Sequence, residues 1–310
     1  MNTAGSGLAL VCGCALSAGC LNTPTPLAPA FSGSVGLPQH GVQTGAVELP
    51  ESGSGFVRYR KLGGYYWGQP GLVEAIEDAT GQVAKALPGG PALSIGDLSA
   101  RNGGKIERHS SHRSGRDVDL LWYVTTPEGA PIDNAHFIQL GADGLGKVPG
   151  TNEYVRLDLG REWLLIKSLL TSEHIEVQWL FASRDVEALL VHYAFDAGED
   201  TELIWRAENA LAEPVDSLPH DDHLHLRIAC SPDASVRGCE GGGPYWNWLP
   251  AQLDVAALGV KELESTEALG QFDDGDPADS ASAAEILPQG PTLLRVTAST
   301  FAPPTRLPGD

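Results

Sequence analysis

The sequence has few basic residues: its 310 residues include 20 Lys and Arg against 40 Asp and Glu, a formal net charge of −20 at pH 7. Phosphate backbones repel a chain of this charge, which argues against nucleic-acid binding. An anionic membrane surface offers it no attraction either. Because 42% of the residues are hydrophobic, the chain can nevertheless bury a sizeable core, so wholesale disorder is excluded.

Long apolar runs are also missing. The run near the N-terminus, residues 8–16, is too short to span a bilayer and is followed by small residues up to Cys20. This pattern resembles a bacterial signal peptide over residues 1–20 that ends in a lipobox, in which case Cys20 carries the lipid. No Lys or Arg precedes the run, and Cys14 is a rival acceptor. A misassigned start codon and an apolar arm of a soluble protein stay open as alternatives.

Cysteine is scarce beyond this segment. Of the 5 cysteines, only Cys230 and Cys239 lie outside the first twenty residues. They flank a turn-like segment, and export favours a local disulfide between them. Zinc binding by this pair is less expected, because the nearby histidines supply a better ligand set.

Composition divides the rest of the chain into three parts. Residues 21–50 are rich in Pro, Gly, Ser and Thr and almost uncharged, which predicts a flexible tether. Residues 51–250 carry the hydrophobic patterning of a globular domain. Residues 251–310 contain ten acidic side chains against three basic ones, which predicts an acidic, poorly structured extension.

Periodicity within the globular part predicts both helices and strands. Helical spacing of apolar residues is found over residues 72–87, 162–170 and 185–193. Segments typical of strands are residues 93–95, 117–124, 175–181 and 223–228. Because these elements show no regular βαβ repeat, the expected fold class is α+β, with a mainly antiparallel sheet and flanking helices.

Five of the 9 histidines gather in two short segments, each beside a predicted strand. Strand alternation places His223 and His225 on one face, and Asp117 and Asp119 alternate in the same way. The loop that carries His112 could fold back towards them. Two histidines and one carboxylate with an open fourth position form the ligand set of a catalytic zinc site. A structural zinc or a polar histidine cluster is the alternative, although structural sites normally use four protein ligands.

These residues also carry a family resemblance. His112, Asp119 seven residues later and a distant His-x-His are similar to the zinc pattern of lysostaphin, D-alanyl-D-alanine carboxypeptidases and hedgehog domains. Residues 95–99, 109–122 and 220–227 resemble penicillin-insensitive murein endopeptidase more closely, and the likeness runs from about residue 59 to 248. It implies a zinc peptidase core of the hedgehog and DD-peptidase type.

The resemblance also implies roles for individual residues. It makes His112, Asp119 and His225 the zinc ligands, with His223 as the general base. His220 would stabilise the oxyanion or position the substrate. Three more residues are expected in supporting positions near the metal: His109, Asp117 and Asp97. For Asp97, capping of the following turn is an equal alternative, and for Asp117 the alternative is a carboxylate that caps the strand.

The implied activity is hydrolysis of the D-alanyl to meso-diaminopimelyl cross-links of peptidoglycan by a Zn²⁺ metallopeptidase in the periplasm. No covalent nucleophile is needed, so such an enzyme is insensitive to β-lactams. The expected partner is the peptidoglycan peptide cross-link, with membrane contact only through a lipid on Cys20. Two other functions stay open: a non-catalytic, zinc-containing module that binds murein, and a zinc DD-carboxypeptidase that releases terminal D-alanine.

Overall fold

A computed structural model describes residues 32–214, 219–241, 246 and 248 of the chain. The predicted signal peptide, Cys20 and the acidic extension over residues 251–310 lie outside these residues, so they stay predictions. Within the described part, none of the helices has the length and apolar character needed to cross a bilayer.

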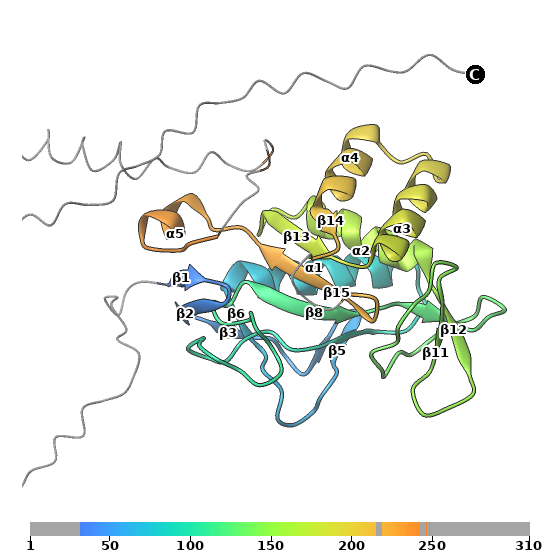
Figure 1. Cartoon of the computed structure of the whole chain (residues 1–310), viewed down its shortest axis with the longest axis horizontal. Coiled ribbons are helices and arrows are strands. Elements are labelled where there is room, and N and C mark those ends of the chain that lie inside the picture. Colours follow the sequence, from blue (N-terminus) through green and yellow to red (C-terminus); the bar gives the residue numbers. More distant parts are fainter. Residues whose placement is uncertain (1–31, 215–218, 242–245, 247, 249–310) are drawn as a thin grey trace, which may run out of the picture. The chain divides into compact units, whose positions relative to one another are not determined.

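A seven-stranded mixed sheet forms the centre of the domain (Figure 1). Its strands, in spatial order, are β14 (Leu211–Ala212), β13 (Val177–Phe181), β15 (His223–Ile228), β8 (Asp117–Leu121), β7 (Leu93–Ile95), β5 (Phe56–Arg58) and β4 (Ser52–Gly53). The β13–β15, β15–β8, β8–β7 and β5–β4 pairs are antiparallel, whereas β13–β14 and β7–β5 are parallel. The predicted α+β class with a mainly antiparallel sheet is confirmed, and the likeness to hedgehog domains stays a prediction.

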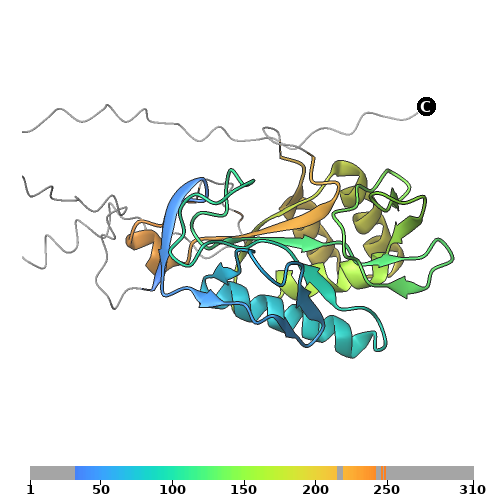
Figure 2. The same ribbon diagram turned by 90° about the horizontal axis from the view of Figure 1, so that it is seen from below.

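Five helices are described, and α1 runs along one face of the sheet (Figure 2). They are α1 (Pro70–Ala86), α2 (Leu159–Leu170), α3 (Arg184–Asp196), α4 (Thr201–Ala210) and α5 (Pro232–Val236). The first three confirm predicted helices with shifts at their ends. Helix α4 was not predicted, although its N-cap is a recognisable signal: the Asp200 side chain accepts from the backbone N–H of Leu203.

The two faces of the central strands have different chemistry. Leu224 and Leu226 of β15 belong to the hydrophobic core, as do Val118 and Leu120 of the neighbouring β8. All four are completely or almost completely buried. Because side chains alternate along a strand, the opposite face of this pair carries the histidines and aspartates. The sheet thus has one apolar face for packing and one polar face for chemistry.

Smaller sheets surround this centre. Their strands are β1 (Gly33–Leu37), β2 (His40–Thr44), β3 (Val47–Glu48), β6 (Trp67–Gly68), β9 (Val124–Thr125), β10 (Pro131–Ile132), β11 (Leu145–Lys147) and β12 (Tyr154–Leu157). β1 pairs with β2 and β3 with β6, while the other four form a sheet in the order β10-β9-β12-β11.

The strands β1 to β3 correct the prediction of a flexible tether over residues 33–48, while residues 21–31 of the predicted tether lie outside the described residues. Composition suggested a tether because the segment is rich in Pro, Gly, Ser and Thr and almost uncharged, yet the β1–β2 hairpin packs on the domain through uncharged polar contacts. Gln43 is almost completely buried and donates from Nε2 to the backbone oxygens of Trp67 and Ala100. The folded region therefore begins by residue 33, well before the predicted start at residue 51.

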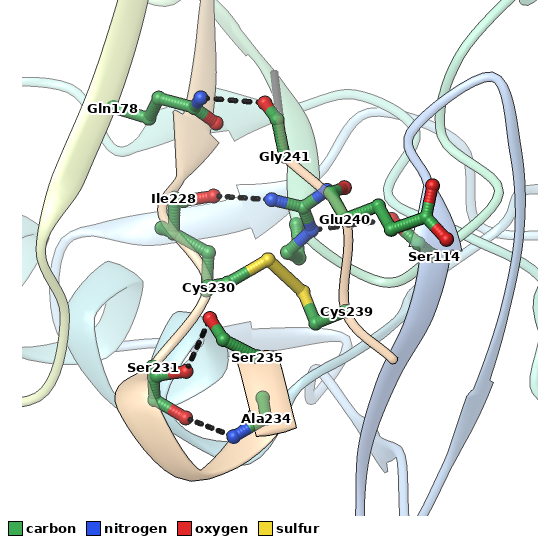
Figure 3. The surroundings of a disulfide bond; sticks show 11 residues. Ser114, Gln178, Ile228, Cys230, Ser231, Ala234, Ser235, Cys239, Glu240 and Gly241 are labelled. Carbon is green, nitrogen blue, oxygen red and sulfur yellow. Dashed lines mark hydrogen bonds between the residues drawn. A yellow bond between two sulfur atoms is a disulfide. The ribbon is translucent and has the colours of Figure 1, made fainter. Parts of the chain in front are cut away.

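The predicted disulfide between Cys230 and Cys239 is present, with a Cα–Cα distance of 5.9 Å (Figure 3). It joins the segment that leaves β15 to a loop that pairs with β1, where Gly36 donates its N–H to the Gly238 oxygen. The bond thus ties the segment after β15 to a loop that is hydrogen-bonded to the N-terminal hairpin.

A buried carboxyl joins α2 to the end of β8. Glu162 is fully buried, and its Oε2 accepts from the backbone N–H of Tyr123 at 3.1 Å. Its Oε1 has no hydrogen-bond partner in the described structure. Burial raises the pKa of Glu162 from 4.5 to about 8, more than the Tyr123 N–H lowers it. The folded protein therefore holds this carboxyl in its protonated form near neutral pH.

This proton predicts a pH dependence of stability. The pKa of Glu162 is higher in the folded protein than in the unfolded chain. Proton binding to Glu162 therefore stabilises the fold fully below about pH 4.5, and this stabilisation is lost as the pH rises to about 8. Glu162→Gln keeps an acceptor for Tyr123 and removes the titration. We expect the variant to be more stable than the wild type at pH 9 by on the order of a few kcal/mol. Denaturant unfolding of both proteins at pH 5 and pH 9 measures this difference, and an equal difference at both values would contradict it.

Candidate metal centre

The pairing of β15 with β8 brings the two histidine-rich segments together. His225 lies directly opposite Asp119, and Arg227 lies directly opposite Asp117. Residues opposite one another in an antiparallel pair share a face, so all four side chains point to the same side of the sheet. Strand alternation predicted which residues of each strand share a face. It did not predict that these two strands would be neighbours in this register.

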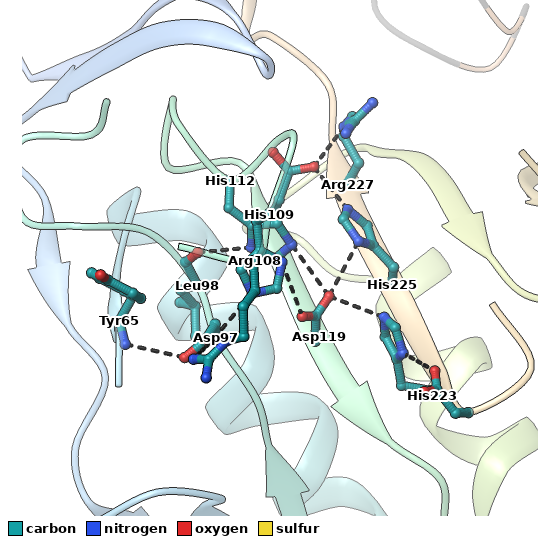
Figure 4. Close-up of polar contacts among 12 residues, drawn as sticks. Tyr65, Asp97, Leu98, Arg108, His109, His112, Asp119, His223, His225 and Arg227 are labelled. Atoms are coloured by element: carbon teal, nitrogen blue, oxygen red, sulfur yellow. Dashed lines mark hydrogen bonds and ion pairs between the residues drawn. The ribbon is translucent and has the colours of Figure 1, made fainter. Parts of the chain in front are cut away.

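One carboxylate oxygen occupies the middle of the cluster (Figure 4). Asp119 Oδ1 lies 3.2 Å from His112 Nε2, 3.2 Å from His223 Nε2 and 3.2 Å from His225 Nδ1. Asp119, His112 and His225 are all buried, whereas His223 is partly exposed. The cluster is therefore partly open to solvent at its His223 edge.

His112 comes from a loop and is held there by the backbone. Its Nδ1 lies 2.7 Å from the backbone oxygen of Leu98, to which it can only donate, so Nε2 keeps its lone pair. His112 has a φ of +62°, an unusual value for a residue other than Gly. The surrounding contacts thus maintain a strained backbone that directs Nε2 at Asp119.

His225 is oriented in an equivalent way from the opposite side. Its Nε2 lies 2.9 Å from Asp117 Oδ1, which also accepts from Arg227 Nε at 2.6 Å. Donation from Nε2 leaves the Nδ1 lone pair directed at Asp119. Burial opposes ionisation of Asp117, but Arg227 and His225 outweigh it and lower the pKa of Asp117 far below its usual range.

The electrostatics of the cluster favour a cation at its centre. Burial disfavours the charged forms of both Asp119 and His112. The attraction between the Asp119 carboxylate and the His112 imidazolium acts against burial in both groups. The pKa of Asp119 is well below its usual value, and that of His112 is raised. Positive charge next to the Asp119 carboxylate is therefore strongly stabilised.

Unsatisfied atoms allow a test of whether a metal ion fits. His112 Nε2 and Asp119 Oδ1 are buried and have no hydrogen-bond partner in the described structure. Buried polar groups rarely stay unpaired, and a metal ion would satisfy both. In the part of the chain that is described, the donor atoms form two groups, each within 4.8 Å: His109, His112, Asp119 and His220, His223, His225. The predicted ligand set takes members from both groups, and its chemistry suits zinc.

His223 and His220 lie at the edge of this set. His223 Nδ1 is 2.5 Å from Asp222 Oδ1, which orients its Nε2 towards Asp119. Burial lowers the pKa of His223, but the negative charges of Asp119 and Asp222 outweigh this effect. Together they raise the pKa of His223 from 6.5 to about 10. His220 is different: burial and the neighbouring His225 and His223 lower its pKa to about 3, so its imidazole is neutral. Its ring centre lies 5.0 Å from that of His223.

The other predicted supporting residues form a network behind His112. His109 lies with Nε2 3.1 Å from Asp97 Oδ2 and Nδ1 3.8 Å from Asp119 Oδ2. Asp97 also accepts from the backbone N–H of Tyr65 at 3.2 Å and pairs with Arg60 at 3.2 Å. Burial raises the pKa of Asp97, but His109, Tyr65 and Arg60 outweigh it and lower the pKa. These contacts orient His109, which is not one of the three predicted ligands, so the role of Asp97 in orienting a ligand stays a prediction.

Aromatic residues that the sequence reasoning missed enclose the histidines. The Phe181 ring centre lies 5.4 Å from that of His225 and 5.7 Å from that of His220. Phe137 packs edge-on against His223 at 5.3 Å. Phe181 was detectable, because it ends a predicted strand. Phe137 belongs to a segment without a regular element, and no sequence signal indicated it.

Comparisons with known proteins agree with this geometry. The family model described as penicillin-insensitive murein endopeptidase matches residues 34–139. A curated protein of that name from Haemophilus influenzae is 27% identical over 278 residues, which cover 88% of this chain and 84% of the relative. A protein of the same name from Klebsiella pneumoniae is 28% identical over 68% of this chain and 70% of the relative. One from Escherichia coli is 26% identical over 74% of this chain and 79% of the relative.

The fold, the cluster around Asp119 and these matches together define a peptidase, and hence a hydrolase. More narrowly, the chain is similar to penicillin-insensitive murein endopeptidases. The matched stretch begins at residue 34 and so includes the β1–β2 hairpin, which composition alone had assigned to a tether.

Proposed function

We propose that the protein is a zinc-dependent endopeptidase that hydrolyses the D-alanyl to meso-diaminopimelyl cross-links of peptidoglycan. The observation that carries the proposal is the environment of Asp119 Oδ1, which is buried, lacks a hydrogen-bond partner in the described structure and lies 3.2 Å from each of three imidazole nitrogens. The names of the relatives supply the substrate class.

His112 Nε2, His225 Nδ1 and the Asp119 carboxylate are the proposed zinc ligands. Bound there, zinc supplies Lewis acidity and lowers the pKa of a water molecule. Hydrogen bonds from the imidazoles to the Leu98 oxygen and to Asp117 turn the ligand nitrogens inward. Because the ligands come from a loop and two adjacent strands, they are oriented before any metal binds.

His223 is the proposed general base. Its Nδ1 is held by Asp222, so its Nε2 faces the cluster at the side that is open to solvent. Zinc held by Asp119 would offset the negative charge that raises the pKa of His223, so that Nε2 is free to take the proton of the attacking water and return it to the leaving amine. Neutral His220, 5.0 Å from His223 between ring centres, is positioned to donate a hydrogen bond to the developing oxyanion or to orient the substrate.

This chemistry needs no covalent serine intermediate, so we expect insensitivity to β-lactams. The substrate and the predicted signal peptide together favour the periplasm, and a lipid on Cys20 would provide the only membrane attachment. Cys20 lies outside the described residues, so the anchor rests on the sequence pattern alone.

Purified sacculi provide the direct test of this function. The zinc-loaded full chain should convert cross-linked muropeptide dimers to monomers, and a zinc chelator should stop the reaction. Mass spectrometry of the products identifies the bond that is cut, since cleavage of the cross-link returns unmodified stem peptides. Addition of zinc after removal of the chelator should restore the activity, which controls for irreversible damage.

Other products of the same experiment would replace the proposal. Release of free D-alanine from uncross-linked pentapeptides, with dimers unchanged, would identify a carboxypeptidase. Unchanged dimers in the presence of stoichiometrically bound zinc would mean that the domain binds murein without cutting it.

A further inference from the structure

A continuous series of aromatic rings leads away from the candidate metal centre. From the inner to the outer end, its rings are those of Phe181, Trp179, Trp246, Trp248 and Trp205. Successive ring centres lie 5.5, 5.3, 4.9 and 5.1 Å apart. We call these five residues the aromatic band. Its inner end touches His225 and His220 through Phe181, and its outer end lies on α4.

The inner part of the band lies on the same face of the sheet as the histidines. Trp179 is paired with Arg227, and Phe181 is paired with His225 across β13 and β15. Trp246 is held against β13 by a hydrogen bond from its Nε1 to the Gln178 oxygen. The band therefore continues the catalytic face of the sheet.

Burial of the band differs from that of the core. All five rings are partly exposed, and Trp205 has 42% of its surface accessible. By contrast, the core residue Trp122 is completely buried. Large aromatic side chains that stay partly exposed beside one another typically mark a surface that binds a ligand.

The charge of the chain restricts what this ligand can be. A protein with a net charge of −20 repels the carboxylates of peptidoglycan stem peptides, which favours uncharged contacts in binding. Aromatic rings provide such contacts for the C–H faces of pyranose sugars. Arg227 lies over Phe181 at the inner end of the band, and Arg206 lies over Trp248, the ring next to its outer end.

We infer that the aromatic band is a subsite for the glycan strand of peptidoglycan, a chain of β-1,4-linked N-acetylated amino sugars. This inference rests on the proposed function: the stem peptide lies at Asp119 while the sugars to which it is attached stack along the band. The band makes the enzyme select cross-links that are still part of a glycan strand over free peptides.

Binding of a chitin hexasaccharide to the zinc-loaded full chain tests this inference without any cleavage. Tryptophan fluorescence should change saturably on titration. Trp205→Ala and Trp248→Ala should each weaken the affinity about tenfold, which corresponds to about 1.4 kcal/mol. Both positions are separated from the histidines by other rings of the band. Trp248→Phe keeps an aromatic face and should retain most of the affinity, while Tyr154→Ala removes a 54% exposed ring outside the band and should have no effect.

Hydrolysis of two substrates separates this inference from the proposed function. The band variants should raise KM for sacculi about tenfold, yet leave kcat/KM unchanged for cross-linked peptides freed of their sugars. Equal losses on both substrates, or no hexasaccharide binding by the wild type, would overturn the glycan subsite. If the wild type binds the hexasaccharide but cuts neither substrate, the proposed function fails and the subsite stands. Thermal unfolding of each variant verifies that it is folded.

Discussion

His225→Ala is expected to lose bound zinc and, with it, all measurable hydrolysis of cross-linked muropeptides. The substitution removes the nitrogen that lies 3.2 Å from Asp119 Oδ1 and is oriented by Asp117. Loss of an outer-sphere partner alone typically weakens metal binding about 10–100-fold, so the loss of a ligand should exceed that range. Equilibrium dialysis against ⁶⁵Zn or elemental analysis of the purified protein measures the metal directly.

A histidine outside the cluster provides the control for this variant. His174 is partly exposed and pairs with Glu74 and Asp78 of α1. His174→Ala should therefore keep both zinc and activity. If His225→Ala retained one zinc per chain with wild-type affinity, His225 would not be a ligand, and the alternative group of His109, His112 and Asp119 would have to hold the ion.

His223→Ala is expected to have the opposite combination of properties: full zinc content with turnover reduced about 10²–10⁴-fold, the usual contribution of a general base. The three proposed ligands and their hydrogen bonds are untouched by this change. Only the imidazole at the solvent-open side is removed, where its Nε2 lies 3.2 Å from Asp119 Oδ1. Metal content and kcat on a purified cross-linked dimer, measured on the same sample, test both halves of the expectation.

Asp222→Asn is the matched control for the orientation of His223. Its oxygen still accepts from His223 Nδ1, which contacts Asp222 at 2.5 Å, but the negative charge is lost. Turnover should fall less than in His223→Ala. If His223→Ala turned over substrate at the wild-type rate, His223 would not be the general base. If the variant lost its zinc, His223 would instead be a zinc ligand.

Local spacing predicted which polar side chains of each strand share a face, whereas the roles of individual residues came from the family resemblance. Alternation along residues 223–228 was enough to put His223 and His225 on one face, and the same holds for Asp117 and Asp119. The register that sets His225 opposite Asp119 depends on the order of strands in the sheet, which local patterns do not contain. The aromatic band was missed for the same reason, since its rings come from β13, α4 and the segment after β15.

The N-terminal hairpin was missed for a different reason. Absence of charge in residues 21–50 was interpreted as flexibility, but uncharged polar side chains can also be buried when they are hydrogen-bonded. Gln43 does this by donating to two backbone oxygens of the domain. A single buried amide thus reversed a conclusion drawn from composition.

The separation of the paired strands along the chain has a consequence for biosynthesis. His225 and Asp117 meet across 108 residues of sequence, and β8 precedes α2, α3 and α4, while β15 follows them. A chain that emerges from its N-terminus therefore cannot complete the proposed zinc site until nearly the whole domain has been made. Contacts so distant in sequence also form late and slowly in folding. A hydrolase able to cut the cell wall would in this way stay inactive until it is almost fully assembled.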